Sequence, residues 1–325
     1  MEQRHLGRTG QRVSRLALGT MTWGRDTDEH EARDQLKAYV EAGGNFIDTA
    51  DVYTDSTAER LIGSFLGDVV KREEVVIATK AASAPGTQRR LDASRTHLLS
   101  ALEGSLRRLG TDYIDLWQLH AWDVHTPLEE TLSALDSAVS MGKVRYAGVS
   151  NYTGWQTAQA ATWQRAVPGR TPIVSTQVEY SLLQRGVERE VVPAALDLGL
   201  GVLPWSPLGR GVLTGKYRTG TPADSRAASP HFAGFVQPYL TEGSQRVVTA
   251  VGTAADGLGV SPLEVALAWV RDRPGVTAPI VGARTAAQLR GALIVEELVL
   301  PKEIREALDE VSAPAAGYPE VFRRG

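Results

Sequence analysis

Short runs of apolar and β-branched residues alternate along this chain with longer segments in which apolar residues recur at helical spacing. The short runs predict buried strands, and apolar residues three and four positions apart predict the inner faces of helices. The predicted strands are LALG, NFID, VVIATK, YIDLWQLH, VRYAGVS, PIVSTQVEY, GVLPWS and APIVG. The predicted helices span about 28–42, 58–66 and 94–109, and others begin near 127, 153 and 188 and after 284.

Eight strands, each closely followed by a helix except the seventh, predict an α/β fold of the (β/α)8 TIM-barrel type. An open doubly wound sheet is the alternative, but its Gly-x-Gly-x-x-Gly fingerprint is missing after the first strand, where GTMTW stands at 19–23. Turn residues 7–10 between two apolar runs predict an N-terminal β-hairpin that forms a plug or lid. The Pro- and Gly-rich stretch 209–243 predicts a long loop after strand seven. Without a linker or an internal repeat, we expect residues 1–325 to form one domain.

Composition narrows the classes of partner. The 325 residues are 42% hydrophobic and carry a net charge of −3, which is too weak to gather nucleic acid or an anionic membrane. The absence of cysteine excludes disulfides, thiolate metal sites and a cysteine nucleophile. No apolar run approaches a membrane span and the N-terminus lacks a signal-peptide core, so we expect a cytoplasmic protein. The sequence thus favours small-molecule partners, and it leaves the oligomeric state open.

Four polar side chains fall at or just after predicted strand ends, where a barrel of this kind builds its site. Singly, Asp48 is typical of a loop cap, Lys80 of a solvated lysine, His120 of a satisfied histidine and Tyr53 of packing. Together they predict proton chemistry: the Lys80 ammonium, held by Asp48, would tune the Tyr53 phenol as a general acid, while His120 orients a carbonyl oxygen. Protonation is half of a carbonyl reduction, and the hydride for the other half implies a nicotinamide cofactor.

Other rim residues suit such a cofactor. Ser150, Asn151 and Gln177 can hydrogen-bond a carboxamide, and Trp205 can stack on a flat ring. The glycine-spaced segment 206–216, with Arg226 farther along, predicts a strap over a pyrophosphate. The sequence GART at 282–285 opens the last barrel helix, where exposed amides and the Arg284 guanidinium would favour a phosphate.

The motifs LGTMTWG, FIDTADVY, VVIATK, LHAWD, GVSNY, WSPLGRGVLTGKY and IVGARTAAQL follow one another in an order that resembles the aldo-keto reductase superfamily over nearly the whole chain. The resemblance implies NADPH bound extended across the strand ends and a catalytic tetrad of Asp48, Tyr53, Lys80 and His120. It implies that Arg284 and Gln288 lie at the adenosine end, where Arg290-Gly291-Ala292 departs from the Glu-Asn pair of many members. The expected cofactor-binding residues are Thr20, Met21, Asp48, Ser150, Asn151, Gln177, Trp205, Ser206, Pro207, Leu208, Gly211, Lys216, Arg226, Gly282, Arg284 and Gln288. We expect Trp23, Tyr53, His120 and Trp122 to line the substrate pocket.

Three functions stay open at this point. The first is NADPH-dependent reduction of an aldehyde or ketone to an alcohol, whose substrate is not readable from the sequence. The second is a redox-sensing regulatory subunit with little turnover, since the strap and Trp205 look closest to the branch with potassium-channel β subunits and bacterial sugar and aldehyde reductases. Those subunits typically carry asparagine where this chain has His120, which favours the enzyme. The third, a metal-dependent hydrolase or lyase, needs a histidine and carboxylate cluster that the strand ends lack, so we expect no metal.

Overall fold

The core of the structure is a ring of parallel strands. The computed structural model describes residues 1–218, 220–222, 225–229, 231–315, 317–318 and 320–323. One sheet has eight strands in the order β11-β10-β9-β8-β5-β4-β3-β12, and every pairing within it is parallel. The ring is completed between β11 and the segment that leads into β12, where Thr277 donates its amide to the carbonyl of Val202 at 2.9 Å. The strands are β3 (Ala17–Gly19), β4 (Phe46–Asp48), β5 (Val76–Ala81), β8 (Ile114–Leu119), β9 (Val144–Ser150), β10 (Ile173–Glu179), β11 (Gly201–Trp205) and β12 (Ile280–Val281).

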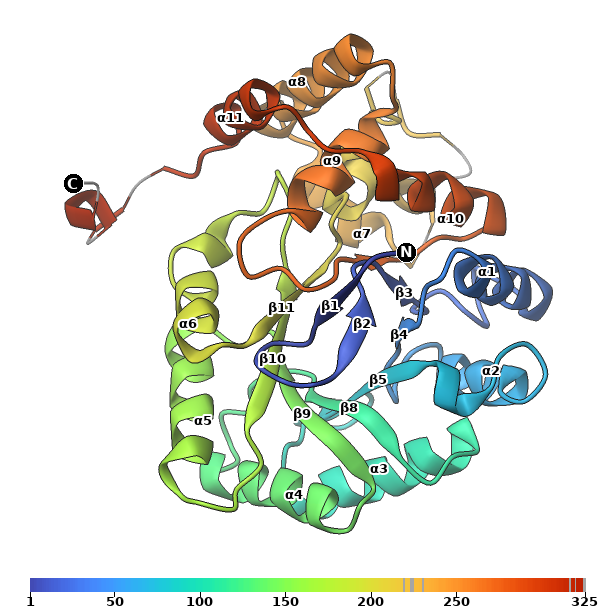
Figure 1. Ribbon diagram of the computed structural model, residues 1–325, viewed down its shortest axis with the longest axis vertical. Helices are drawn as coiled ribbons and strands as arrows, with labels where there is room; N and C mark the ends of the chain where they lie inside the picture. The colour runs from blue at the N-terminus through green and yellow to red at the C-terminus, as the bar shows by residue number, and fades with distance from the viewer. Residues whose placement is uncertain (219, 223–224, 230, 316, 319, 324–325) are drawn as a thin grey trace.

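Helices surround this ring, as Figure 1 shows, and the predicted (β/α)8 barrel is confirmed. Several helices begin where a side chain accepts a hydrogen bond from the first turn, as Asp28, Ser94 and Thr153 do. The barrel helices are α1 (Glu29–Glu41), α2 (Thr57–Phe65), α3 (Arg95–Leu109), α4 (Leu128–Ser140), α5 (Gly154–Ala166), α6 (Val191–Leu198), α9 (Pro262–Arg271) and α10 (Ala286–Leu293). The helices α7 (Ala233–Val236), α8 (Glu242–Leu258) and α11 (Lys302–Val311) are additions to the barrel.

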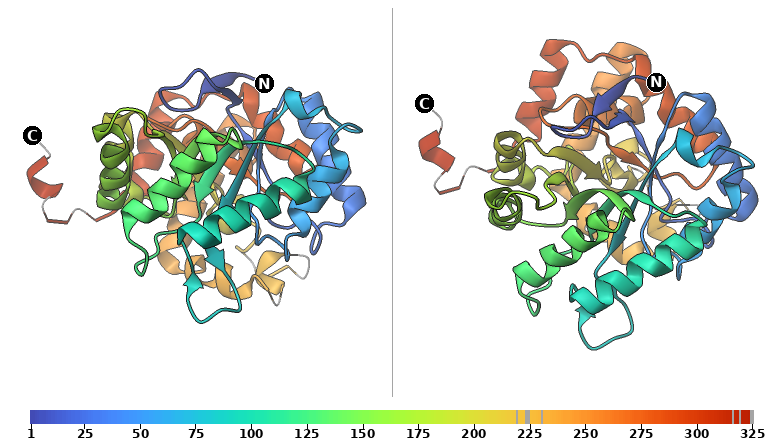
Figure 2. Two further views of the ribbon diagram at one scale, coloured as in Figure 1. Left: turned by 90° about the horizontal axis from the view of Figure 1, so that it is seen from below. Right: turned by 60° about the horizontal axis from the view of Figure 1, so that its bottom comes forward.

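The expected N-terminal hairpin is a plug. Strands β1 (Gln3–His5) and β2 (Arg12–Ser14) pair antiparallel, and Leu6 and Val13 are fully buried in one cluster with Phe46 and Val76. Because Phe46 and Val76 begin their strands, the hairpin closes the amino-terminal end of the barrel. In the left view of Figure 2 the hairpin lies at the top and the segment after β11 at the bottom, so the carboxyl-terminal end is the one left for a site.

The expected elements form with small shifts in their bounds. The helix expected near residue 188 is first a 3-10 turn, η2 (Gly186–Glu188), and the α-helix starts only at Val191. The stretch 209–243 contains η3 (Gly209–Thr214), η4 (Arg226–Ala228), α7 and η5 (Gln237–Tyr239) instead of a structureless loop. The remaining pieces are η1 (Arg72–Glu74), η6 (Ile294–Glu297), η7 (Glu320–Arg323) and the hairpin of β6 (Ser83–Ala84) with β7 (Arg90–Leu91) in the segment after β5.

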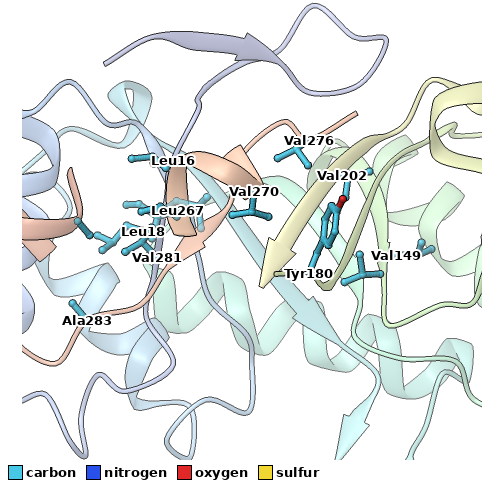
Figure 3. Packing of buried hydrophobic residues seen from close by; sticks show 14 of the residues in the cluster. Leu16, Leu18, Val149, Tyr180, Val202, Leu267, Val270, Val276, Val281 and Ala283 are labelled. Atoms are coloured by element: carbon cyan, nitrogen blue, oxygen red, sulfur yellow. The ribbon is translucent and has the colours of Figure 1, made fainter. Parts of the chain in front are cut away.

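The main hydrophobic cluster lies between the strands and the helices that cover them. Figure 3 shows part of it, with Leu267 and Val270 of α9 in the same cluster as the strand residues Leu18, Val202 and Val281. Burial of these side chains fixes each helix against the ring, and the ring in turn fixes where each strand ends.

A single buried hydroxyl joins α1, β4 and the segment before β3. Tyr39 is fully buried, and its hydroxyl donates to the carbonyl of Leu16 at 2.7 Å and accepts from the Phe46 amide at 3.0 Å. Gly44 passes so close that an added Cβ would lie 2.4 Å from the Tyr39 ring. Without the hydroxyl, the Phe46 amide would be buried with no acceptor.

We therefore expect Tyr39→Phe to lower the free energy of unfolding by about 1–3 kcal/mol, the cost of leaving buried backbone groups unsatisfied. Chemical denaturation followed by circular dichroism measures this loss. Tyr318→Phe is the matched control, because that side chain is 83% exposed and its hydroxyl is free to bind water. Equal stability of the two variants would contradict the role given to the Tyr39 hydroxyl.

Candidate active site

The carboxyl-terminal ends of the strands surround a cavity of about 450 Å3. Strand register explains how distant residues meet there. Asp48, the last residue of β4, pairs with Ala78, so Lys80 stands one inward-facing position farther along β5. Gln118 of β8 pairs with Lys80, and Gln177 of β10 pairs with Ser150 of β9. The polar residues expected at one rim do lie at one rim.

Lys80 is buried beneath the cavity and makes three hydrogen bonds. Its Nζ lies 2.7 Å from Asp48 Oδ2, 2.9 Å from the carbonyl oxygen of Thr49 and 3.1 Å from the Tyr53 hydroxyl. Burial alone would lower the pKa of Lys80, but the charge of Asp48 and the bonds to Asp48 and Tyr53 outweigh burial, so the pKa is raised. Lys80 is therefore a full cation directly against the phenol, as the sequence led us to expect.

The carboxylate of Asp48 contacts side chains from two other strands, β5 and β10. While Oδ2 accepts from Lys80, Oδ1 accepts from the side-chain amide of Gln177 at 2.7 Å. The same amide nitrogen lies 3.4 Å from Gln118 Oε1. Gln177 lines the cavity as predicted, but its amide nitrogen is committed to Asp48, so a bound carboxamide would find this donor already used.

Tyr53 and His120 face each other at the bottom of the cavity, with ring centroids 6.0 Å apart in an edge-to-face arrangement. Burial raises the pKa of the Tyr53 phenol, and Lys80 opposes this rise without cancelling it. The phenol thus keeps its proton at neutral pH. Burial and the nearby Lys80 charge lower the pKa of His120 to about 3, so its imidazole is neutral. Its Nδ1 is buried with no hydrogen-bond partner among the described residues.

Most of the residues expected to bind a cofactor line this cavity. Those that do are Thr20, Met21, Asp48, Ser150, Asn151, Gln177, Trp205, Ser206, Pro207, Leu208, Gly211, Lys216, Gly282, Arg284 and Gln288. The side chain of Arg226 lies outside what the structure describes. Ser150 carries a buried Oγ that has no hydrogen-bond partner in the described part of the chain, so it is a polar atom available to a ligand.

Two of these residues are already paired with each other. Asn151, at a left-handed φ of 57°, donates from Nδ2 to the His120 carbonyl at 2.9 Å and accepts from the Trp205 indole at 3.0 Å. The Trp205 ring lies at a 20° interplanar angle to Phe235, with centroids 6.2 Å apart. Each of these bonds uses one donor or one lone pair, so Asn151 keeps one amide N–H and one lone pair for a ligand.

The start of α10 differs from the expectation of exposed amides. Its first helical amide, that of Ala286, donates to the Glu31 carboxylate of α1 at 2.7 Å, and Thr285 caps the Gln288 amide at 3.2 Å. These donors are occupied by the protein itself, and Glu31 adds a negative charge next to them. An anion at this end of the cavity would depend on the Arg284 side chain instead.

Two tryptophans expected in the substrate pocket lie outside the cavity lining in the described residues. Trp23 is fully buried, stacks edge-on against Phe65 and donates its indole N–H to Gln35 Oε1 at 3.0 Å. This partner lets a large aromatic side chain stay in the core, so the prediction of a pocket role does not hold for Trp23. Trp122 packs instead against Tyr152 and Trp155, at 5.1 and 5.4 Å between ring centroids.

A cluster around Arg210 was not singled out by the sequence. Arg210 lies in the strap at a φ of 58°, and its Nε and Nη2 each donate to a Glu179 carboxylate oxygen at 2.7 Å. Its guanidinium lies 3.9 Å from the Phe235 ring centroid and bonds the Phe235 carbonyl. The arginine thus ties the strap to the end of β10 and to α7. Only its position between Gly209 and Gly211 could have indicated an unusual turn.

Comparison with known proteins agrees with this geometry. A sequence profile described as "Aldo/keto reductase family" matches residues 15–313. The chain belongs to the aldo/keto reductase family. The resemblance inferred from the seven motifs is thereby confirmed. No helix within the described ranges has the length and apolar character needed to cross a bilayer. Nor do those ranges hold a cluster of three or more His, Cys, Asp or Glu side chains placed for a metal ion.

Three relatives illustrate the range of this aldo/keto reductase group. The "uncharacterized oxidoreductase YrpG" of Bacillus subtilis (strain 168) is 40% identical over 337 residues, which cover 99% of each chain. A "probable voltage-gated potassium channel subunit beta" of Oryza sativa subsp. japonica is 36% identical over 328 residues, 98% of each chain. An NADP(+) aryl-alcohol dehydrogenase of Phanerodontia chrysosporium is 30% identical over 336 residues, 95% of this chain and 85% of the relative.

The lowered pKa of His120 has a direct spectroscopic consequence. A group whose pKa falls to about 3 on folding stays uncharged at every pH above about 4, so its ring resonances should not move between pH 8 and pH 5. Nuclear magnetic resonance of the imidazole nitrogens measures this, and a His120→Asn variant assigns the signals. A His120 resonance that titrates in this interval would contradict the neutral imidazole.

Proposed function

We propose that this protein reduces an aldehyde or ketone to an alcohol with NADPH. The observation that carries the proposal is the contact of the Lys80 ammonium with the Tyr53 hydroxyl, 3.1 Å apart, at the bottom of a cavity that extends to Arg284. A protonated phenol held against a fixed cation is a proton donor whose conjugate base is stabilised where it forms. The family membership and the relatives named as oxidoreductases support the same class of chemistry.

The polar atoms that line the cavity support a nicotinamide dinucleotide as its ligand. The unpartnered Ser150 Oγ and the carbonyl side of Gln177 lie near Tyr53, where they would hold a carboxamide. Arg284, at the other end, would hold a 2′-phosphate by a forked pair of hydrogen bonds. When bound, the cofactor supplies the hydride, which no side chain can give.

The reaction divides between hydride and proton. With the hydride supplied to the carbonyl carbon, the carbonyl oxygen would take the proton from the Tyr53 hydroxyl, which would leave a phenolate beside Lys80. Lys80, fixed by Asp48, offsets that negative charge. His120, as a neutral imidazole, orients the carbonyl oxygen by a hydrogen bond without adding a second cation. The phenolate regains a proton from solvent before the next turnover.

Tyr53→Phe tests the proton donor. We expect the variant to bind NADPH as the native protein does and to lose at least about a hundredfold in kcat, because general acid catalysis contributes roughly 10²–10⁴. Steady-state NADPH absorbance with a panel of aldehydes and ketones measures kcat, and fluorescence titration measures cofactor binding. Tyr113→Phe, a tyrosine whose ring packs under Arg72 and Arg145 away from the cavity, is the matched control. Full activity in Tyr53→Phe would refute the assignment.

The same assay tests the second candidate function, that of a redox-sensing subunit. The similarity to proteins named as potassium-channel β subunits is the observation that favours this candidate. Such a protein would bind NADPH with one cofactor per chain and show negligible turnover on every carbonyl tested. The His120 and Tyr53 pair at the cavity favours turnover, because a binding protein has no need for a proton donor held against a cation.

Arg284→Ala tests the choice of cofactor. Since the amides of Ala286 and Gln288 at the start of α10 are already bonded to Glu31 and Thr285, we assign the 2′-phosphate contact to the Arg284 guanidinium. We expect the Kd for NADPH to rise by roughly tenfold to a hundredfold, the loss of a charge-assisted bond of about 1.5–3 kcal/mol, while the Kd for NADH changes little. Arg305→Ala, an exposed arginine on α11 that does not line the cavity, is the control. Equal weakening of both cofactors would rule out the assigned contact.

A further inference from the structure

A second polar cavity shares the loop after β4 with the candidate active site. It has a volume of about 570 Å3 and lies between the loop after β4, the β6–β7 hairpin and α3. Its lining includes Asp51, Ser56, Asp92, His97 and Arg108, and we call it the Asp51 cavity. Asp51 links this cavity to the active site, because it follows the β4 strand end and stands two residues before Tyr53.

Asp51 is held by backbone hydrogen bonds, while one oxygen of its carboxylate is left without a partner. Its amide donates to the carbonyl oxygen of Lys80 at 3.2 Å, and its carbonyl oxygen accepts from Ser56 Oγ at 2.7 Å. The side chain is 7% exposed, and Oδ1 has no hydrogen-bond partner among the described residues. The Val52 amide is a donor to this carboxyl, but a buried carboxylate with one unpartnered oxygen is still costly, so the group gains from holding a proton.

The charges around Asp51 come from several elements. Glu59 of α2 is fully buried, and its carboxylate accepts from Arg108 Nε of α3 at 2.7 Å and from Thr79 Oγ1 of β5 at 2.6 Å. The remaining charged or titratable groups that face Asp51 or its cavity are Lys80 and Asp48 of the active site, Tyr53, and Arg89, Asp92, His97 and Arg107. Burial and then the Glu59 charge raise the pKa of Asp51 to about 7, against the opposing charges of Arg108 and Lys80.

We propose that Asp51 is a positioning residue for the proposed reduction, which exchanges its proton with solvent through the Asp51 cavity and thereby sets how tightly Tyr53 holds its own proton. This inference rests on the proposed function. Below pH 7 the neutral Asp51 leaves Lys80 as the dominant charge on the phenol. Above pH 7 the ionised Asp51 raises the pKa of Tyr53, so the phenol is a weaker acid and gives up its proton less readily.

The single-turnover rate of NADPH oxidation, measured against pH, tests this coupling apart from cofactor release. In the native protein we expect the rate to fall between pH 6 and pH 8, with a midpoint near 7. A fall of roughly threefold to tenfold is the size expected when one charge acts on another through a partly buried site. Asp51→Asn, which cannot ionise, should keep the faster, acidic rate at both pH values. Glu59→Gln removes the like charge and should move the midpoint to lower pH. Asp92→Asn and His97→Gln, which change titratable groups of the same cavity, should keep the native profile.

The outcomes separate this inference from the proposed function. A native protein that turns over with no step near pH 7, or an Asp51→Asn variant that keeps the step, would overturn it while leaving the reductase intact. A step lost in His97→Gln would assign the titration to the histidine and also overturn it. Carbon-13 resonance of the Asp51 carboxyl, titrated in the native protein, gives a reading independent of turnover. A midpoint near the ordinary aspartate value would refute the proposal even if no carbonyl is reduced.

Discussion

The carboxylate of Asp48 holds the candidate site together. It receives Lys80 on one oxygen and Gln177 on the other, each at 2.7 Å, and so links two strands that lie on different sides of the barrel. Lys80 is fully buried, and removing one partner of a buried ion pair costs about 3–5 kcal/mol because the other charge is left alone. Without Asp48, the partners of the ammonium among the described residues would be the Thr49 carbonyl and the phenol. The position of Tyr53 relative to its cation therefore depends on this carboxylate.

Much of this arrangement could be predicted, because it follows from two local rules. Strands of a parallel barrel end at one face, and side chains alternate along each strand. Asp48, Lys80 and Gln177 could thus be assigned to one rim from their places at strand ends. What the rules could not supply is register. Only the pairing of Asp48 with Ala78 shows that Lys80 stands one inward step beyond it, which brings its Nζ over both Asp48 and Tyr53.

The less predictable features are hydrogen bonds between polar groups that lie far apart in the sequence. Asn151 and Trp205 are separated by 54 residues, and Glu31 and Ala286 by 255, yet each pair shares a hydrogen bond. A sequence shows that such groups can bind a ligand, but not that the protein already uses them. Trp23 is a similar case. Its place in the loop after β3 suggested a pocket wall, but Gln35 provides a partner for the indole inside the core, and burial of the ring is then favourable.

Lys80 and His120 lie near the same phenol but differ in charge: Lys80 is a cation and His120 is neutral. Lys80 stays charged because Asp48 and Tyr53 outweigh its burial, and that charge is one reason why His120, also poorly solvated, is neutral. A cationic His120 would repel Lys80 and make the phenol lose its proton before a substrate needs it. A neutral imidazole still donates one hydrogen bond, so in the proposed reduction the full charge of Lys80 would stabilise a phenolate and the uncharged donor of His120 would orient a carbonyl. The positive charge of Lys80 and the neutrality of His120 are thus two consequences of one electrostatic arrangement.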